Sequence, residues 1–159
     1  MSLSGPKPEY WRQCSESREQ RVESPQVIQE RIVREIECAG DSFDQFDFLL
    51  SKAAELPEMP EERKIADVLV KDCQSQVWLY LHDIDGRPVI EADSDTLMIR
   101  GTIQILKDMF DGQPPQAVVD CDVNYIQRTD LAYAFDSKRV AGQAAIVARI
   151  KEFAQALCA

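Results

Sequence analysis

The spacing of hydrophobic residues predicts a helix near the start of the chain and a strand in its middle. Three isoleucines recur every four residues within 25–39, behind Ser24, a typical helix cap, and before Gly40, which ends the helix. Residues 77–82 form an alternating run of the kind found in half-buried strands. Residues 1–23 show no clean period, and we expect them to form a loosely ordered N-terminal extension.

A second helix is predicted after Gly40, because residues 42–45 have the pattern of a capping box. Its apolar face is expected to consist of Phe43, Phe46, Leu50, Ala53 and Ala54. Pro57 and Pro60 end this helix, and residues 68–70 are predicted to form a short strand.

An Asp-Gly pair at 85–86 predicts a hairpin that joins the strand at 77–82 to a returning strand at 88–92. Further helices are expected at 95–111, 114–119 and 137–157. The side chains expected to face inward from the last helix are Val140, Ala144, Val147 and Ile150. Strands followed by helices packed on one side give an α+β fold. We expect a small antiparallel three-stranded sheet packed against several helices, with residues 24–159 forming a single domain.

Composition and charge narrow the class of function. The chain has 45% hydrophobic and 29% charged residues, which is typical of a globular domain. Residues 41–159 carry 12 basic and 21 acidic side chains, so this part holds −9 of the formal net charge of −10. A nucleic-acid partner is not expected, because binding the phosphate backbone needs a basic face. A basic patch on another protein fits better, with a plain solvated acidic surface as the alternative.

Hydropathy and cysteine usage favour a cytoplasmic protein without a membrane partner. No apolar stretch approaches the roughly 18 residues of a membrane span, and the N-terminus lacks the basic-then-apolar pattern of a signal peptide. The cysteines, odd in number and widely spaced, are Cys14, Cys38, Cys73, Cys121 and Cys158. This pattern favours free thiols in a reducing compartment.

Cys73 lies in a polar loop just before the predicted strand, where a reactive group is both exposed and positioned. No second cysteine is near enough in sequence for a CxxC pair or a zinc knuckle. Cys73 is therefore a lone nucleophile or a small apolar filler, the commoner role of a free cysteine. His82, the only histidine, is nine residues away, about 30 Å if fully extended, and is not expected to be its base. Asp93 and Asp95 are expected to cap the following helix, with a partner contact as the alternative.

The run Cys73-Gln74-Ser75-Gln76-Val77-Trp78 resembles the signature of the SufE family, sulfur-acceptor proteins that work with cysteine desulfurases. The blocks that are similar to the family's next motifs, in the same order, are Glu91 to Asp95, Gly101, Pro114 to Gln116, Asp120 to Val123, and Arg139 with Gly142. Similar proteins usually carry glycine where this chain has Asp72. Aspartate is one of the few other residues that tolerate a positive φ, but its carboxylate would oppose thiolate formation beside it.

The resemblance implies a SufE- or IscU-like fold and a role in sulfur transfer. A pyridoxal-phosphate-dependent cysteine desulfurase, SufS-like or CsdA-like, would form a persulfide whose outer sulfur the Cys73 thiolate attacks. Cys73 would then relay the sulfur to an iron–sulfur scaffold complex, with no cofactor or metal in this chain. The residues expected to contact the partner or support the loop are Asp72, Gln74, Ser75, Asp95 and Arg139. We also expect Cys73 to be largely buried until the desulfurase draws it outward.

Two functions of other classes stay open. An IscU-like cluster scaffold would hold iron through several cysteines and an acid, and Cys38, Cys73 and Cys121 do not show that spacing. An acidic adaptor would bind its partner without using a thiol, and desulfurase activation that survives loss of Cys73 would favour it.

Overall fold

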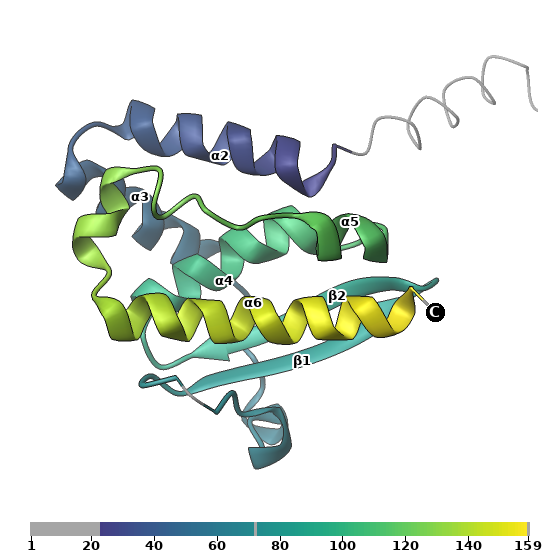
Figure 1. The fold of residues 1–159 in the computed structure, drawn as a ribbon. Helices are drawn as coiled ribbons and strands as arrows, with labels where there is room; N and C mark the ends of the chain where they lie inside the picture. The colour runs from purple at the N-terminus through teal and green to yellow at the C-terminus, as the bar shows by residue number, and fades with distance from the viewer. Residues whose placement is uncertain (1–22, 72, 159) are drawn as a thin grey trace, which may run out of the picture.

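The computed structural model describes residues 23–71 and 73–158, so the predictions for residues 1–22 and for Asp72 lie outside the described residues. The elements follow the order α2 (Pro25–Ala39), α3 (Ser42–Glu55), η1 (Glu61–Arg63), η2 (Ala66–Val68), β1 (Val77–Ile84), β2 (Arg87–Ser94), α4 (Leu97–Phe110), α5 (Pro115–Asp120), η3 (Asp130–Ala134) and α6 (Ser137–Leu157). Figure 1 shows α2 to α5 gathered on one side of the β1–β2 hairpin, with α6 lying along it. The α+β class is the one that the sequence predicts.

The sheet of the described residues has two strands, which corrects the expected third strand at 68–70. The chain enters this stretch from the 3₁₀ helix η2, and Leu69 forms a single antiparallel bridge to Trp78. The Val70 N–H donates to the Val77 carbonyl at 2.7 Å. Because η2 precedes this pairing and the Cys73 loop follows it, only two residues can pair with β1, too few to make a strand.

The hairpin forms at the predicted Asp-Gly pair. Asp85 and Gly86 have φ values of 54° and 79°, so both lie in the left-handed region that a two-residue type I′ turn requires. The turn fixes the antiparallel register, which places Leu79 opposite Ala92. Both of these side chains belong to the core.

Helix α3 departs from the prediction in its cap and its buried face. The capping box is formed by Asp41 and Asp44, one residue earlier than the expected Ser42: each aspartate accepts the other's backbone N–H, at 3.2 and 3.0 Å. The side chains that α3 buries are Gln45, Leu49 and Ala53. Of the predicted apolar face, only Ala53 is therefore buried, and Phe43 is 82% exposed.

The close approach of α4 decides which face of α3 is buried. Helix α4 packs along α3, and a Cβ at Gly101 would collide with the Leu49 carbonyl. The bare glycine backbone lets the two helices meet at this point, so the residues beside Leu49 become the buried ones. A similar correction applies to α6, whose bounds match the prediction but whose buried residues are Gly142, Gln143, Ile146, Ile150 and Ala154. Of its expected inward set, only Ile150 is buried.

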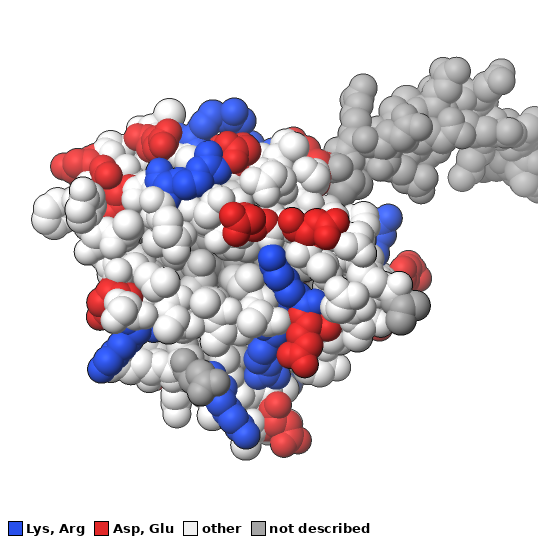
Figure 2. All heavy atoms as spheres, viewed as in Figure 1, with Lys and Arg blue, Asp and Glu red and all other residues white. Residues whose placement is uncertain are grey.

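Acidic and basic side chains are interspersed on the face drawn in Figure 2, around a broad uncharged area. No helix in the described part of the chain is both long and apolar enough to span a bilayer.

Candidate functional site

Cys73 lies in the loop that follows Val70 and leads into β1. Its side chain is partly buried and packs against the hydrophobic core, so most of the thiol is covered, as expected, while part of it remains open to solvent. The thiol rests against α6 at Gly142: a Cβ placed there would lie 2.9 Å from Cys73 Sγ. Glycine provides the shallow seat that the thiol occupies, and that seat is too open to cover it fully.

The residues after Cys73 are tied to the segment between β2 and α4. Gln76 N–H donates to Asp95 Oδ1 at 3.1 Å, and Asp95 N–H donates back to the Gln76 carbonyl at 3.3 Å. The buried Ser94 hydroxyl donates to the same carbonyl at 2.7 Å. Thr96 Oγ1 donates to Ser75 Oγ at 2.9 Å. The C-terminal half of the loop therefore has a polar anchor, with Cys73 placed two residues beyond it.

Sequence reasoning named Ser75 and Asp95 near this site but missed Ser94, Thr96 and the contact at Gly142. The sequence did carry a signal for Ser94 and Thr96, because short hydroxyl side chains between a strand and a helix often form hydrogen bonds with neighbouring backbone. The structure brings Ser75 and Asp95 together through Thr96, whose hydroxyl lies 2.9 Å from Ser75 Oγ and 3.1 Å from Asp95 Oδ1.

The other predicted site residues are more scattered. Gln74 is exposed at the loop surface. Arg139 lies in the first turn of α6, where its N–H donates to the cap Asp136 at 2.9 Å and its guanidinium lies 3.7 Å from the same carboxylate. His82 lies beside Tyr80 on β1, with ring centroids 5.4 Å apart and the ring planes tilted by 49°. This position gives no support to a role for His82 as a base.

The expectation that Asp93 and Asp95 cap α4 is wrong. The N-cap of α4 is Thr96, and among the described residues no side chain caps this helix. Asp93 is instead 2% exposed and accepts the N–H groups of Met59, at 3.0 Å, and Ser94, at 2.8 Å. It also forms an ion pair with Arg100 of α4. Its carboxylate therefore fastens the connector after α3 to the end of β2.

Charge and hydrogen bonding keep Asp93 ionised despite its burial. Burial alone would raise its pKa, but the Met59 and Ser94 N–H donors and the Arg100 guanidinium outweigh it and hold the pKa below the usual range. Arg100 also donates to the Leu56 carbonyl at 2.7 Å. We assign this cluster to the support of the fold beside the loop rather than to chemistry at the thiol.

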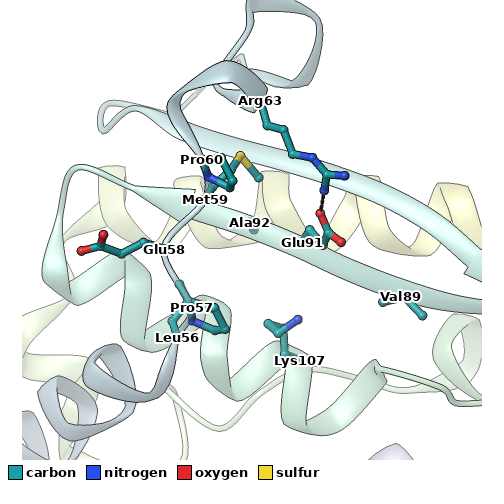
Figure 3. A pocket seen from close by; sticks show the side chains of 10 residues that line it. All are labelled: Leu56, Pro57, Glu58, Met59, Pro60, Arg63, Val89, Glu91, Ala92 and Lys107. Carbon is teal, nitrogen blue, oxygen red and sulfur yellow. Dashed lines mark hydrogen bonds and ion pairs between the residues drawn. The ribbon is translucent and has the colours of Figure 1, made fainter.

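A separate cavity of about 420 Å³ opens beyond the outer edge of β2. Figure 3 shows the connector residues Pro57 to Pro60 on one side, Lys107 opposite, and Arg63 bridged to Glu91 across the mouth. The residues that line it are Leu56, Pro57, Glu58, Met59, Pro60, Arg63, Val89, Glu91, Ala92 and Lys107. Neither Cys73 nor any other described residue of its loop lines this cavity, so we separate it from the candidate thiol site.

The remaining described cysteines offer no partner for Cys73. Cys38, Cys121 and Cys158 are free, and burial is the main cause that raises the pKa of the Cys121 thiol. Within residues 23–71 and 73–158, no three His, Cys, Asp or Glu side chains gather as a metal site would require. The described site is thus a single thiol on an anchored loop.

Comparisons with known proteins add the family. A family model described as SufE, Fe-S metabolism associated domain, matches residues 30–154. An uncharacterised SufE-like protein of Rhizobium etli is 28% identical over 131 residues, which are 79% of this chain and 88% of that protein. A chloroplastic quinolinate synthase of rice is 33% identical over 119 residues, 74% of this chain but 17% of that protein.

A solved structure supports the fold alone. The solution structure of a hypothetical protein from Thermus thermophilus matches with a TM-score of 0.68 and 16% identity, over 82% of this chain and 96% of that one.

Proposed function

This chain belongs to the SufE family, and on that premise we propose that it accepts persulfide sulfur from a cysteine desulfurase on Cys73. The loaded protein then relays the sulfur to an iron–sulfur cluster assembly scaffold. The position of Cys73 is the observation that supports this most: a single thiol, half-buried on a loop, resting on a glycine of α6. In this proposal the protein works in the cytoplasm as a partner of the desulfurase rather than as a stand-alone enzyme.

The transfer is an exchange at sulfur that balances without an oxidant. The Cys73 thiolate attacks the outer sulfur of the donor's persulfide, and a new S–S bond forms on Cys73. The S–S bond of the donor breaks, its electron pair leaves with the donor's cysteine as a thiolate, and Cys73 holds the S–SH group. Sulfur moves at constant oxidation state, and the pyridoxal phosphate that generates it belongs to the desulfurase.

The arrangement of the loop suits both requirements of this transfer, a defined position for the thiol and an open approach for the donor sulfur. The hydrogen bonds at Ser75 and Gln76 hold one side of the loop, so the thiol has a defined place from which to react. The contact with Gly142 shields one side of the sulfur, and the partial exposure of Cys73 leaves room for a donor sulfur to approach. Exchange needs such an unhindered line of attack.

The test is to incubate the protein with a SufS-type desulfurase and cysteine, then locate added sulfur by intact mass and peptide mapping. We expect one sulfur atom on Cys73, none in Cys73→Ser, and full loading in Cys158→Ser, the matched variant at an exposed thiol. Equal loading of a second cysteine, or a serine variant that still carries sulfur, would contradict the proposal.

Two further assays separate the alternatives. An acidic adaptor would still activate the desulfurase in the Cys73→Ser protein. A cluster scaffold would give a stable iron–sulfide chromophore on anaerobic reconstitution, and the described residues offer no clustered ligand set that favours it.

A further inference from the structure

Three large apolar side chains are exposed together at the end of the molecule that carries Cys73. Phe43, Leu97 and Tyr133 are 82%, 62% and 85% exposed. Phe43 and Tyr133 line a groove of about 350 Å³ together with Ser42, Phe46, Met98 and Ala134, and Leu97 directly precedes Met98 of this lining. Covering two aromatic rings this exposed would remove on the order of 300 Å² of surface from water, which is in the range of the largest apolar patch of a typical monomer, a patch that is often functional.

Two connections along the chain link this apolar groove to the thiol loop. Leu97 directly follows Thr96, whose hydroxyl donates to Ser75 in the loop. Tyr133 lies in η3, which leads into α6 and so to the Gly142 seat of Cys73. Figure 1 shows the N-terminal ends of α3, α4 and α6 at the same left-hand end of the molecule as the start of β1.

The charges on the same segments indicate the chemistry of the occupant. The exposed aspartates at the starts of α3, α4 and α6 and in η3 are Asp41, Asp44, Asp47, Asp95, Asp130 and Asp136. The exposed basic residues there are Lys138 and Arg139, with Arg139 beside Asp136; Arg100, in the first turn of α4, is half-buried and paired with Asp93. An apolar centre with an acidic surround complements a protein surface that has an apolar protrusion flanked by lysine and arginine.

We propose that the groove lined by Phe43, Phe46, Met98 and Tyr133, together with Leu97, is the docking surface for the cysteine desulfurase that delivers sulfur to Cys73. This inference rests on the proposed function and adds where the donor binds and by what chemistry. A donor seated there presses on Leu97, next to the Thr96–Ser75 hydrogen bond, and so acts on the anchor of the loop. Docking and release of the thiol from its seat are thereby coupled.

The test compares the triple variant Phe43→Ala/Leu97→Ala/Tyr133→Ala with Tyr80→Ala/Ile84→Ala, a control that removes exposed apolar side chains from β1. Affinity for a SufS-type desulfurase is measured by titration calorimetry in the Cys73→Ser background, which separates binding from sulfur transfer. We expect the triple variant to weaken binding about 100-fold, because buried aromatic anchors contribute most of the affinity of such interfaces. The control should bind within about twofold of the parent.

Two further measurements show what each outcome means. With Cys73 present, the triple variant should react with a small alkylating reagent at the parental rate, and its circular dichroism should be unchanged. Parental affinity in the triple variant, or no binding by the parent, would overturn the docking surface even if Cys73 still accepts sulfur at high donor concentration. Loss of self-association in the centrifuge with unchanged desulfurase affinity would assign the groove to a second copy instead. A parent that binds tightly yet accepts no sulfur would refute the proposed function and leave the docking result standing.

Discussion

Replacing Gly142 by alanine should push Cys73 out of its seat while leaving helix α6 in place. The new Cβ would lie 2.9 Å from Cys73 Sγ, whereas carbon and its neighbours pack best at about 3.5–4.0 Å. Either helix α6 or the Cys73 loop must therefore move away from the other by roughly 0.6–1 Å. The helix is held by its Asp136 cap and by buried Ile146 and Ile150, so the loop is the partner that moves.

The size of the effect follows from the overpacking and from helix propensity. Forcing an extra methyl group into a packed contact costs about 1–3 kcal/mol. If the loop avoids this by opening, the ratio of open to seated thiol rises about fivefold at the lower limit and more than a hundredfold at the upper. The helix itself gains up to about 1 kcal/mol from alanine in place of glycine.

The assay is the rate of alkylation of Cys73 by iodoacetamide, measured beside the free energy of unfolding in urea. Gly142→Ala should react at least about fivefold faster than the parent and unfold with equal or higher stability. Ala144→Gly is the matched control, because Ala144 is exposed on the same helix: it should lose about 1 kcal/mol with no change in alkylation rate. An unchanged rate in Gly142→Ala would refute the reasoning, as it would mean that the helix yields instead of the loop.

Three more outcomes are expected. Thr96→Val removes the hydroxyl that bonds Ser75 and should raise hydrogen exchange across residues 73–77, whereas Thr129→Val, whose hydroxyl bonds only its own segment, should not. The folded pKa of Asp93 is below its unfolded value near 4, so the stability that this carboxylate contributes is present above that value and is lost as pH falls through the folded pKa. Asp93→Asn should therefore lower the free energy of unfolding by about 3 kcal/mol at neutral pH and make stability depend less on pH in acid. Cys121, whose burial raises its pKa, should be alkylated far more slowly than Cys158 at neutral pH, and equal rates in a folded sample would contradict the buried position.

Sequence patterns correctly predicted the structural features that depend only on neighbouring residues. The Ser24 cap, the Asp-Gly turn and the ends of α6 depend on residues within a few positions of one another, and the structure agrees with each. The shared run that begins at Cys73 indicated the family, which the comparisons confirm. Capping was less certain, because Asp41 and Ser42 both have suitable side chains and only the backbone conformation selects Asp41.

The features that sequence reasoning missed are contacts between distant segments. The buried face of α3 depends on where α4 crosses it at Gly101, and Gly101 is 52 residues from Leu49 in the numbering. The seat of Cys73 depends on Gly142 in the last helix. Asp93 lies just before α4, where a capping residue is expected, but its carboxylate contacts Met59 of the connector and Arg100 and so has another role. Helical or alternating periodicity reports which residues are apolar but does not identify their partners.

The interactions around Cys73 differ in strength on its two sides, and this difference bears on how the thiol could move. On the side of Gln76, several hydrogen bonds join the loop to Ser94, Asp95 and Thr96, each a net contribution of about 0.5–1.5 kcal/mol. At Gly142 the thiol meets bare backbone, where each atom pair contributes only about 0.1–0.2 kcal/mol. Lifting the thiol off Gly142 therefore gives up only weak contacts at that point, whereas releasing the anchor breaks hydrogen bonds. A partner that docks beside Leu97 would need only a small difference in affinity between the two loop positions to draw the thiol outward, with the anchor as the hinge.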